Sequence, residues 1–185
     1  MPTVAETRFL ILATDGFEQS ELFAPRDAFL ADGAKVSLAS PKRDPIQGMK
    51  HDEKGDTIRP DLTLDEVDPA EYDVLILPGG VANPDSLRME EKAIEIIESF
   101  MDDGKVVAAI CHGPWLLAEA DVIDDRTVTS WPSIRTDLFN AGAEVVDQEV
   151  AVDGNLITSR NPDDIPAFID AIRTAVTQDE AVPAS

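Results

Sequence analysis

The sequence predicts a doubly wound α/β sandwich, in which a mostly parallel β-sheet lies between layers of helices. Short apolar runs typical of buried strands alternate with helical stretches along most of the chain. The first strand, helix and strand have the spacing of a βαβ unit, which pairs its strands in parallel. The length of 185 residues and a hydrophobic content of 43% suit one domain with a full core. We therefore expect a single domain over residues 1–185, with frayed tails at 1–7 and 178–185.

The first half of the chain supplies that βαβ unit and a polar excursion. A strand at 8–13 is broken by Thr14-Asp15-Gly16-Phe17, a helix follows at 18–31, and a strand follows at 36–39. Residues 41–68 are rich in Pro, Gly, Asp and Lys, which indicates a surface excursion with a hairpin or edge strands. We expect His51, within this excursion, to be a solvated loop histidine.

The second half repeats the alternation with shorter pieces. Pro78-Gly79-Gly80 ends one strand, and Cys111-His112-Gly113-Pro114 follows another without a break. Ser133 is placed to cap a helix, and Asp153-Gly154-Asn155 has the signature of a hairpin turn. The expected strands are 72–77, 105–110, 127–129, 150–152 and 156–158, and the expected helices are 90–101, 115–120, 133–140 and 163–176.

The charge of the chain limits its partners. With 37 acidic and 15 basic residues, the formal net charge is −22. Such a polyanion repels nucleic acid and anionic membranes, so we expect neither as a partner. Concentrated salt screens strong self-repulsion, and we hypothesise that the protein works in a high-salt, halophilic cytoplasm.

The amino terminus and the cysteine count bear on location and metals. No apolar run is long enough to span a bilayer, and residues 1–7 lack the layout of a signal peptide, so we expect a cytoplasmic protein. One cysteine excludes an internal disulfide and suits a reducing compartment. With only His51 and His112 besides, we expect no metal and no cofactor, although a carboxylate site for a hard cation stays open.

Cys111 is the candidate nucleophile. Sites in parallel sheets form beyond the carboxyl ends of the strands, and Cys111 stands where a strand turns sharply into a helix. Ala109 and Gly113 are small enough for such a crowded turn. The start of the following helix should favour the reactive thiolate. The alternative is a buried, inert cysteine.

Residues that could act with Cys111 follow other strand ends. Glu18 could donate a hydrogen bond to the thiolate as an acid, or act as acid or base, or simply favour the helix start. Gly79 and Gly80 let backbone approach a ligand, and the N–H groups of Gly80 and His112 are our candidate oxyanion hole. As a base, His112 needs a third group to orient it, and adjacent side chains on a turn tend to diverge.

In these motifs the chain resembles the PfpI/ThiJ superfamily, and within it the PfpI-type intracellular proteases. The resemblance runs from Phe9 to Val176 and is carried by Ala108-Ala109-Ile110-Cys111-His112-Gly113-Pro114, Leu77-Pro78-Gly79-Gly80, Glu91-Lys92-Ala93, Asn140-Ala141-Gly142-Ala143, Val152-Asp153-Gly154-Asn155 and Ser159-Arg160. It implies a flavodoxin-like fold, a nucleophile at Cys111, an acidic partner at Glu18 and an oxyanion hole near Gly80 and His112. It also implies a homo-oligomer, a dimer or a hexamer built from dimers.

For the protease-like members, the resemblance implies a triad of Cys111, His112 and a glutamate from an adjacent subunit. That glutamate would be Glu91, with Glu90 as the alternative at the same helix start. Trp115 departs from the pattern, because a polar residue is expected there. Together with Trp131 it would narrow an apolar pocket mouth that also includes Gly79 and Gly113.

Three functions follow from these residues. The leading prediction is a PfpI-type cysteine hydrolase in which Cys111 attacks the carbonyl carbon of a peptide or a small carbonyl substrate. The first alternative is a cofactor-independent glyoxalase or deglycase that acts on methylglyoxal or glycated groups. The second alternative is a redox-sensing stress chaperone, because a reactive thiol is prone to oxidation.

Overall fold

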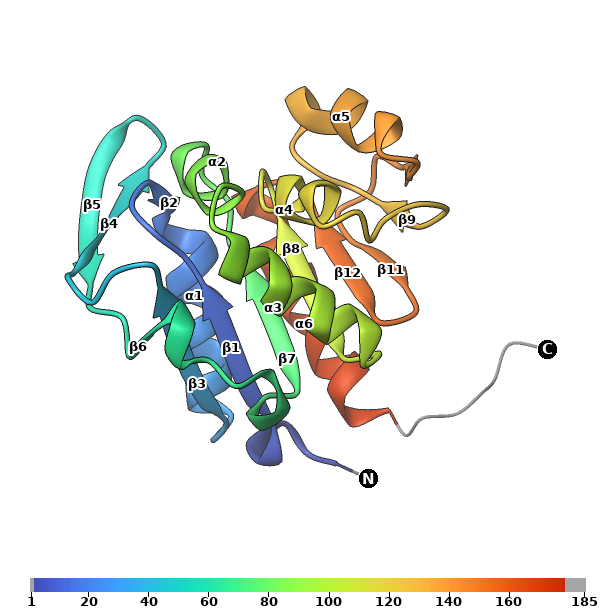
Figure 1. Cartoon of the computed structure of the whole chain (residues 1–185). Helices are drawn as coiled ribbons and strands as arrows, with labels where there is room; N and C mark the ends of the chain where they lie inside the picture. Colours follow the sequence, from blue (N-terminus) through green and yellow to red (C-terminus); the bar gives the residue numbers. More distant parts are fainter. Residues whose placement is uncertain (1, 179–185) are drawn as a thin grey trace.

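A seven-stranded sheet forms the centre of the computed structural model, which describes residues 2–178 (Figure 1). Its strand order is β11-β12-β8-β7-β1-β3-β6, and every neighbouring pair is parallel except β11 and β12. The predicted mostly parallel, flavodoxin-like sandwich is therefore confirmed. The strands are β1 (Arg8–Leu12), β3 (Lys35–Ser40), β6 (Leu62–Thr63), β7 (Val74–Leu77), β8 (Val106–Ile110), β11 (Ala151–Asp153) and β12 (Leu156–Ser159).

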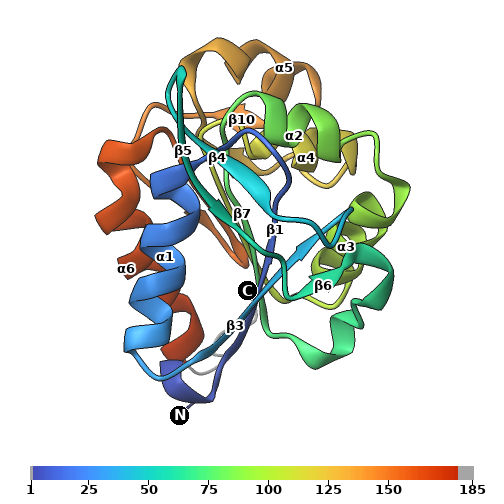
Figure 2. The same ribbon diagram turned by 90° about the vertical axis from the view of Figure 1, so that its left-hand side faces the viewer.

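Helices cover both faces of this sheet. In Figure 2, α1 (Gln19–Ala31) and α6 (Ile165–Thr177) lie on one side, and α3 (Glu91–Asp102) and α4 (Pro114–Glu119) lie on the other. Each layer has its own core of buried apolar side chains. All residues of β7 are buried, as are the last four of β1 and of β8, because these strands contact a helical layer on each face.

The polar excursion places a second, smaller sheet over the carboxyl ends of the central strands. As predicted, it contains a hairpin, formed by β4 (Ile46–Lys50) and β5 (Glu53–Ile58). The hairpin joins the two-residue strand β2 (Phe17–Glu18), which the sequence pattern did not predict. β2 connects this sheet directly to the start of α1.

Further short elements complete this end of the molecule. The predicted helix after Ser133 is a 3₁₀ turn followed by α5, and the strand at 127–128 pairs in parallel with a partner that was not predicted. A helix, α2, also forms after the glycine pair where none was predicted. The bounds are α2 (Ala82–Leu87), β9 (Thr127–Val128), α5 (Arg135–Asn140), β10 (Glu144–Val145) and the 3₁₀ turns Val4–Glu6, Leu64–Glu66, Pro69–Glu71, Pro132–Ile134 and Pro162–Asp164.

The predicted frayed tail at residues 1–7 is wrong for most of its length. Val4–Glu6 forms a 3₁₀ turn that the Glu6 carboxylate stabilises by accepting hydrogen bonds from Thr3 N and Thr3 Oγ1. Thr7 is buried at the start of the sheet. Of the predicted tail at 178–185, residues 179–185 lie outside the described residues. Within residues 2–178, no helix has both the length and the apolar character needed to cross a membrane.

Candidate active site

Cys111 lies on the sharp turn that the sequence predicts between β8 and α4. Its φ is +64°, a left-handed conformation that is strained for a residue with a side chain. Two backbone hydrogen bonds hold the turn, from Cys111 N to Ser159 O at 3.0 Å and from Trp131 N to Cys111 O at 2.9 Å. A Cβ at Gly113 would lie 2.9 Å from Ile110 O and would clash with Leu77 O, so only glycine fits there.

The carboxyl that lies beside Cys111 is that of Glu21. Glu21 is fully buried in the first turn of α1, its Oε1 accepts a hydrogen bond from Gly79 N at 3.1 Å, and its Oε2 is buried without a hydrogen-bond partner among residues 2–178. A Cβ added at Gly79 would lie 2.7 Å from Glu21 Oε1 and 2.8 Å from Cys111 Cβ, so the two side chains are neighbours. Burial, followed by the charge of Glu18, raises the pKa of Glu21 to about 8. Near pH 7 this carboxyl is therefore mostly protonated and can act as a donor.

The thiol is not made acidic by its turn, contrary to the sequence-based expectation. Burial, followed by the charge of Glu21, raises the pKa of Cys111 above its ordinary value. Backbone hydrogen bonds from Gly80 and His112, the two predicted oxyanion donors, oppose this effect. When Glu21 is protonated its charge is lost, and a hydrogen bond from the carboxyl to the sulfur favours the thiolate.

His112 reaches the sulfur although the two residues are adjacent. Its Nδ1 lies 3.2 Å from Cys111 Sγ. The ring is nearly buried, and burial lowers the pKa of His112, so the imidazole is neutral near pH 7 and able to accept a proton. It lies 5.3 Å from the ring of Trp115 and 5.8 Å from the ring of Trp131, centroid to centroid.

Glu18 lines the cavity and hydrogen-bonds the hairpin. It immediately precedes α1, and its carboxylate accepts a hydrogen bond from His51 N at 3.2 Å. The hydrogen bonds of the Glu18 carboxylate go to His51 N, and the predicted role of Glu18 as an acid or base that acts with Cys111 stays a prediction. His51 is exposed, as predicted, and forms the tip of the β4–β5 hairpin with a φ of +56°. The hairpin and Glu18 therefore hold each other beside the nucleophile.

The glycine pair brings backbone against Cys111. Gly80 has a φ of +80°, and a Cβ there would lie 2.7 Å from Glu18 N. A Cβ at Gly79 would lie 2.8 Å from Cys111 Cβ. The buried Asn83 fixes this loop by donating to Pro78 O at 3.0 Å and Gly79 O at 3.1 Å, while its own Oδ1 accepts from Thr14 N. The sequence analysis missed Asn83, because nothing in the pattern predicted α2.

These residues surround a cavity of about 620 Å³. Trp131 lines it as predicted, whereas Trp115 packs behind His112 and does not line the cavity. Glu91 is exposed at the first residue of α3 and does not line it either, so its proposed role from a neighbouring subunit stays a prediction. The lining residues are Gly16, Glu18, Glu21, Met49, His51, Asp52, Gly80, Val81, Ala82, Cys111, His112, Trp131, Ser133 and Pro162.

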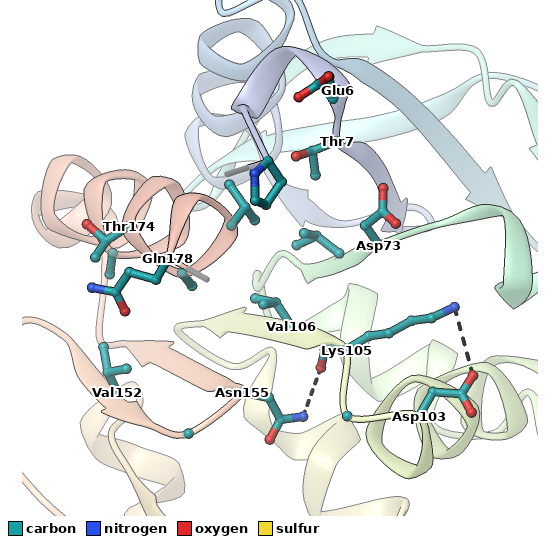
Figure 3. Close-up of a pocket in the computed structure, with 17 residues that line it drawn as sticks. Glu6, Thr7, Asp73, Asp103, Lys105, Val106, Val152, Asn155, Thr174 and Gln178 are labelled. Atoms are coloured by element: carbon teal, nitrogen blue, oxygen red, sulfur yellow. Dashed lines mark hydrogen bonds and ion pairs between the residues drawn. The ribbon is translucent and has the colours of Figure 1, made fainter. Parts of the chain in front are cut away.

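A larger cavity, of about 1000 Å³, opens at the amino ends of the strands (Figure 3). Two of its polar side chains already have partners: Lys105 Nζ lies 3.8 Å from Asp103 Oδ2, and Asn155 Nδ2 donates to Lys105 O at 2.8 Å. None of the predicted site residues lines it. Within residues 2–178, no three or more His, Cys, Asp or Glu side chains are grouped so that they could hold a metal ion.

Known proteins resemble this chain in both fold and sequence. The model of the DJ-1/PfpI family matches residues 7–175. Deglycase TK1284 of Thermococcus kodakarensis is 48% identical over 162 residues, which cover 88% of this chain and 95% of the relative. Protein/nucleic acid deglycase 2 of Escherichia coli is 46% identical, covering 87% and 92% of the two chains. The crystal structure of Drosophila melanogaster DJ-1beta aligns with a TM-score of 0.84 at 29% identity, over 94% of this chain and 92% of the other.

Proposed function

Because the chain belongs to the DJ-1/PfpI family, we propose that it is a cofactor-independent deglycase and glyoxalase that acts on dicarbonyl compounds and their adducts. The observation that carries this proposal is the contact between Cys111 and the buried carboxyl of Glu21, whose pKa is raised to about 8. A group that titrates close to the working pH is well suited to both give and take a proton. The deglycase names of the relatives support this reading over the peptidase predicted first.

The first step is addition of the thiolate to the aldehyde carbon of methylglyoxal. A C–S bond forms, the carbonyl oxygen takes the electron pair and then the proton of the Glu21 carboxyl, and a hemithioacetal results beside a Glu21 carboxylate. The N–H groups of Gly80 and His112 surround the sulfur and are the donors available to this oxygen. If the substrate is an adduct on an amine, the sulfur displaces the amine at the carbinol carbon, and the amine leaves with the thiol proton.

The second step moves a proton between neighbouring carbons. The carboxylate of Glu21 takes the proton from the carbon bonded to sulfur and returns it to the former ketone carbon. The hydroxyl proton meanwhile passes from the oxygen of the first carbon to the oxygen of the second, and the two transfers together convert the hemithioacetal into a thioester. Water then hydrolyses the thioester, releasing lactate and regenerating the thiol. The sum is methylglyoxal plus water to lactate, or adduct plus water to lactate and free amine, with no external oxidant or reductant.

The charge of the cavity favours neutral or cationic substrates. Glu18 and Asp52 line it, and no Lys or Arg does. An anionic substrate would enter against these carboxylates, whereas an ammonium or guanidinium group would gain from them. We therefore expect adducts of basic side chains to react faster than adducts of the same dicarbonyl on acidic carriers.

The test is lactate formation from methylglyoxal by the purified protein in concentrated KCl. Cys111→Ser and Glu21→Gln should each lower the rate by 100-fold or more, on the order of the loss found for other groups that act directly on the reacting atoms. Glu53→Gln is the control for loss of a carboxylate near the site: Glu53 lies on the β4–β5 hairpin but does not line the cavity, and this variant should react like the wild type. Equal rates for the wild type and Cys111→Ser would overturn the proposal.

A cysteine peptidase is the second candidate, favoured by the 3.2 Å distance between Cys111 Sγ and His112 Nδ1. It requires a third group to orient His112, and we propose Glu91 of a neighbouring subunit for this role. Peptide cleavage by the separated oligomer, lost in Glu91→Gln while lactate formation persists, would support it. Cleavage that is unchanged in Glu91→Gln, or that persists in a monomeric variant, would contradict the shared triad.

A further inference from the structure

Two tryptophans hold the ring of His112, and the proposed reaction does not account for one of them. Trp131 stacks on the imidazole with an interplanar angle of 24°, and Trp115 meets it nearly edge-on at 66°. The backbone of Trp131 is fixed to the turn at Cys111, because the backbone N–H of Trp131 donates a hydrogen bond to Cys111 O. Trp115 does not line the substrate cavity, so its contact with His112 needs another explanation.

Trp115 is fixed by a charged residue from a different helix. Its Nε1 donates a hydrogen bond to Asp137 Oδ2 at 2.8 Å. Trp115 belongs to α4 and Asp137 to α5, and these two helices pack together at the carboxyl end of the sheet (Figure 1). Arg88 completes the setting: its guanidinium carbon lies 5.6 Å from the indole centroid, and Glu119 accepts two hydrogen bonds from it.

This packing restrains the imidazole from within the chain itself. Among the described residues, the contact with Cys111 is the single hydrogen bond that the His112 ring makes. A nucleophile–base pair works only when the base is held in place. Here two indoles hold the imidazole, one stacked on it and one nearly edge-on.

We propose that Asp137 is a positioning residue for the Cys111–His112 pair, and that it acts through the indole of Trp115. The carboxylate fixes the indole, the indole fixes the imidazole, and the imidazole stays within reach of the sulfur. This proposal concerns the reactivity of the thiol itself, and it holds whatever substrate the protein takes.

The test is the rate at which iodoacetamide alkylates the protein, measured as a function of pH. Cys111 is the only cysteine, so the label reports on this thiol alone. Asp137→Leu removes the acceptor and should slow alkylation near neutral pH by about fivefold, the effect of losing one ordinary hydrogen bond. It should also move the midpoint of the pH profile upward. Asp137→Asn keeps an acceptor and should stay within twofold of the wild type.

Further variants separate positioning from general damage. Trp115→Phe keeps the ring but loses the N–H, so it should match Asp137→Leu, and the double variant should be no slower than either one. Glu98→Leu, an exposed acid on α3, is the control for loss of a surface charge. If Asp137→Leu does not fold, as judged by near-UV circular dichroism, Trp115→Phe alone decides the question.

Three outcomes would overturn the proposal. The first is an alkylation profile for Asp137→Leu, or for Trp115→Phe, that coincides with the wild type. The second is an Asp137→Asn variant as slow as Asp137→Leu, because the hydrogen bond would then not be responsible. The third is a double variant whose loss equals the sum of the two single losses on a free-energy scale. These alkylation measurements do not depend on deglycase activity. They therefore decide the role of Asp137 even if the protein lacks that activity, so failure of this proposal is distinguishable from failure of the proposed function.

Discussion

Glu18 and Glu21 lie three residues apart at the start of α1, and their surroundings give them different chemistry. Glu18 is partly exposed and bonded to the hairpin, whereas Glu21 is fully buried and bonded to Gly79. A buried carboxyl without a cation beside it keeps its proton to higher pH. Glu18 adds to this effect through its own charge. The charge of the partly exposed Glu18 therefore raises the pKa of the buried Glu21.

Replacing Glu21 should change how stability depends on pH. The pKa of Glu21 is about 8 in the folded protein against 4.5 for the ordinary group, so between these values the folded state holds a proton that the unfolded state has released. Raising the pH from 5 to 8 therefore lowers the free energy of unfolding. Glu21→Gln stays neutral, and its denaturant midpoint should fall less over this range than that of the wild type. Parallel curves for the two proteins would contradict the raised pKa.

Gly80 should not tolerate a side chain. Its positive φ is strained for alanine, and the added Cβ would lie 2.7 Å from Glu18 N. We expect Gly80→Ala to lower the free energy of unfolding by about 1–3 kcal/mol and to slow alkylation of Cys111. Gly104→Ala is the matched control, because it has a similar φ of +68° and nothing within 4 Å of the added Cβ. Equal losses of stability and reactivity would show that φ alone, and not the close approach, matters at Gly80.

Among the secondary-structure elements, α2 has the clearest structural task. It carries Asn83, which binds Pro78 O, Gly79 O and Thr14 N and so ties two strand-end loops together. Six residues are too few for a helix to be stable alone, so packing rather than propensity forms it. This explains why the sequence pattern does not predict α2 even though the site depends on it.

Removing Asn83 should loosen the glycine loop. Asn83→Ala leaves buried backbone groups without partners, which costs about 1–3 kcal/mol for each unpaired group. We expect a lower denaturant midpoint together with slower lactate formation. Asn83→Asp keeps the acceptor for Thr14 N but loses both donor hydrogen bonds. Comparing the two variants therefore shows how much of the lost stability comes from the donors and how much from the acceptor. A wild-type midpoint for Asn83→Ala would show that α2 does not hold the loop.

Charge dominates the behaviour of the whole molecule. The net charge of −22 makes the folded state repel itself, and the ion pairs between side chains are mostly at the surface, where each contributes little. Added salt screens repulsion over a Debye length of about 8 Å at 0.15 M and about 3 Å at 1 M. The halophilic character proposed from the composition thus has a direct physical test.

The thermal midpoint should rise as KCl increases from about 0.1 M to several molar. The rise should shrink near pH 4, because carboxylates are then partly neutral and there is less repulsion to screen. Sucrose at matched water activity is the control for general exclusion effects. A midpoint that does not rise with KCl at neutral pH would contradict a protein adapted to high salt.

Local pattern was enough to predict the sheet and the position of Cys111 on the turn after β8. Buried parallel strands read as continuous apolar runs, and their carboxyl ends share one edge, so Cys111 and Gly79-Gly80 had to meet. The chain's charge likewise follows from composition alone. These features depend on periodicity, chain direction and counting, all of which a single sequence contains.

Only the tertiary structure decided which side chains complete the site. Choosing Glu21 over Glu18 depends on which side of α1 faces Gly79 and Cys111, and no local pattern specifies this. The contact of Trp115 with His112 depends on α4 packing against α5, elements separated along the chain. The spacing of residues along the chain does not specify which way their side chains point across such a contact. The sequence by itself therefore determined that Cys111 lies at the carboxyl edge of the sheet, and packing determined which acid and which aromatic rings lie beside Cys111 and His112.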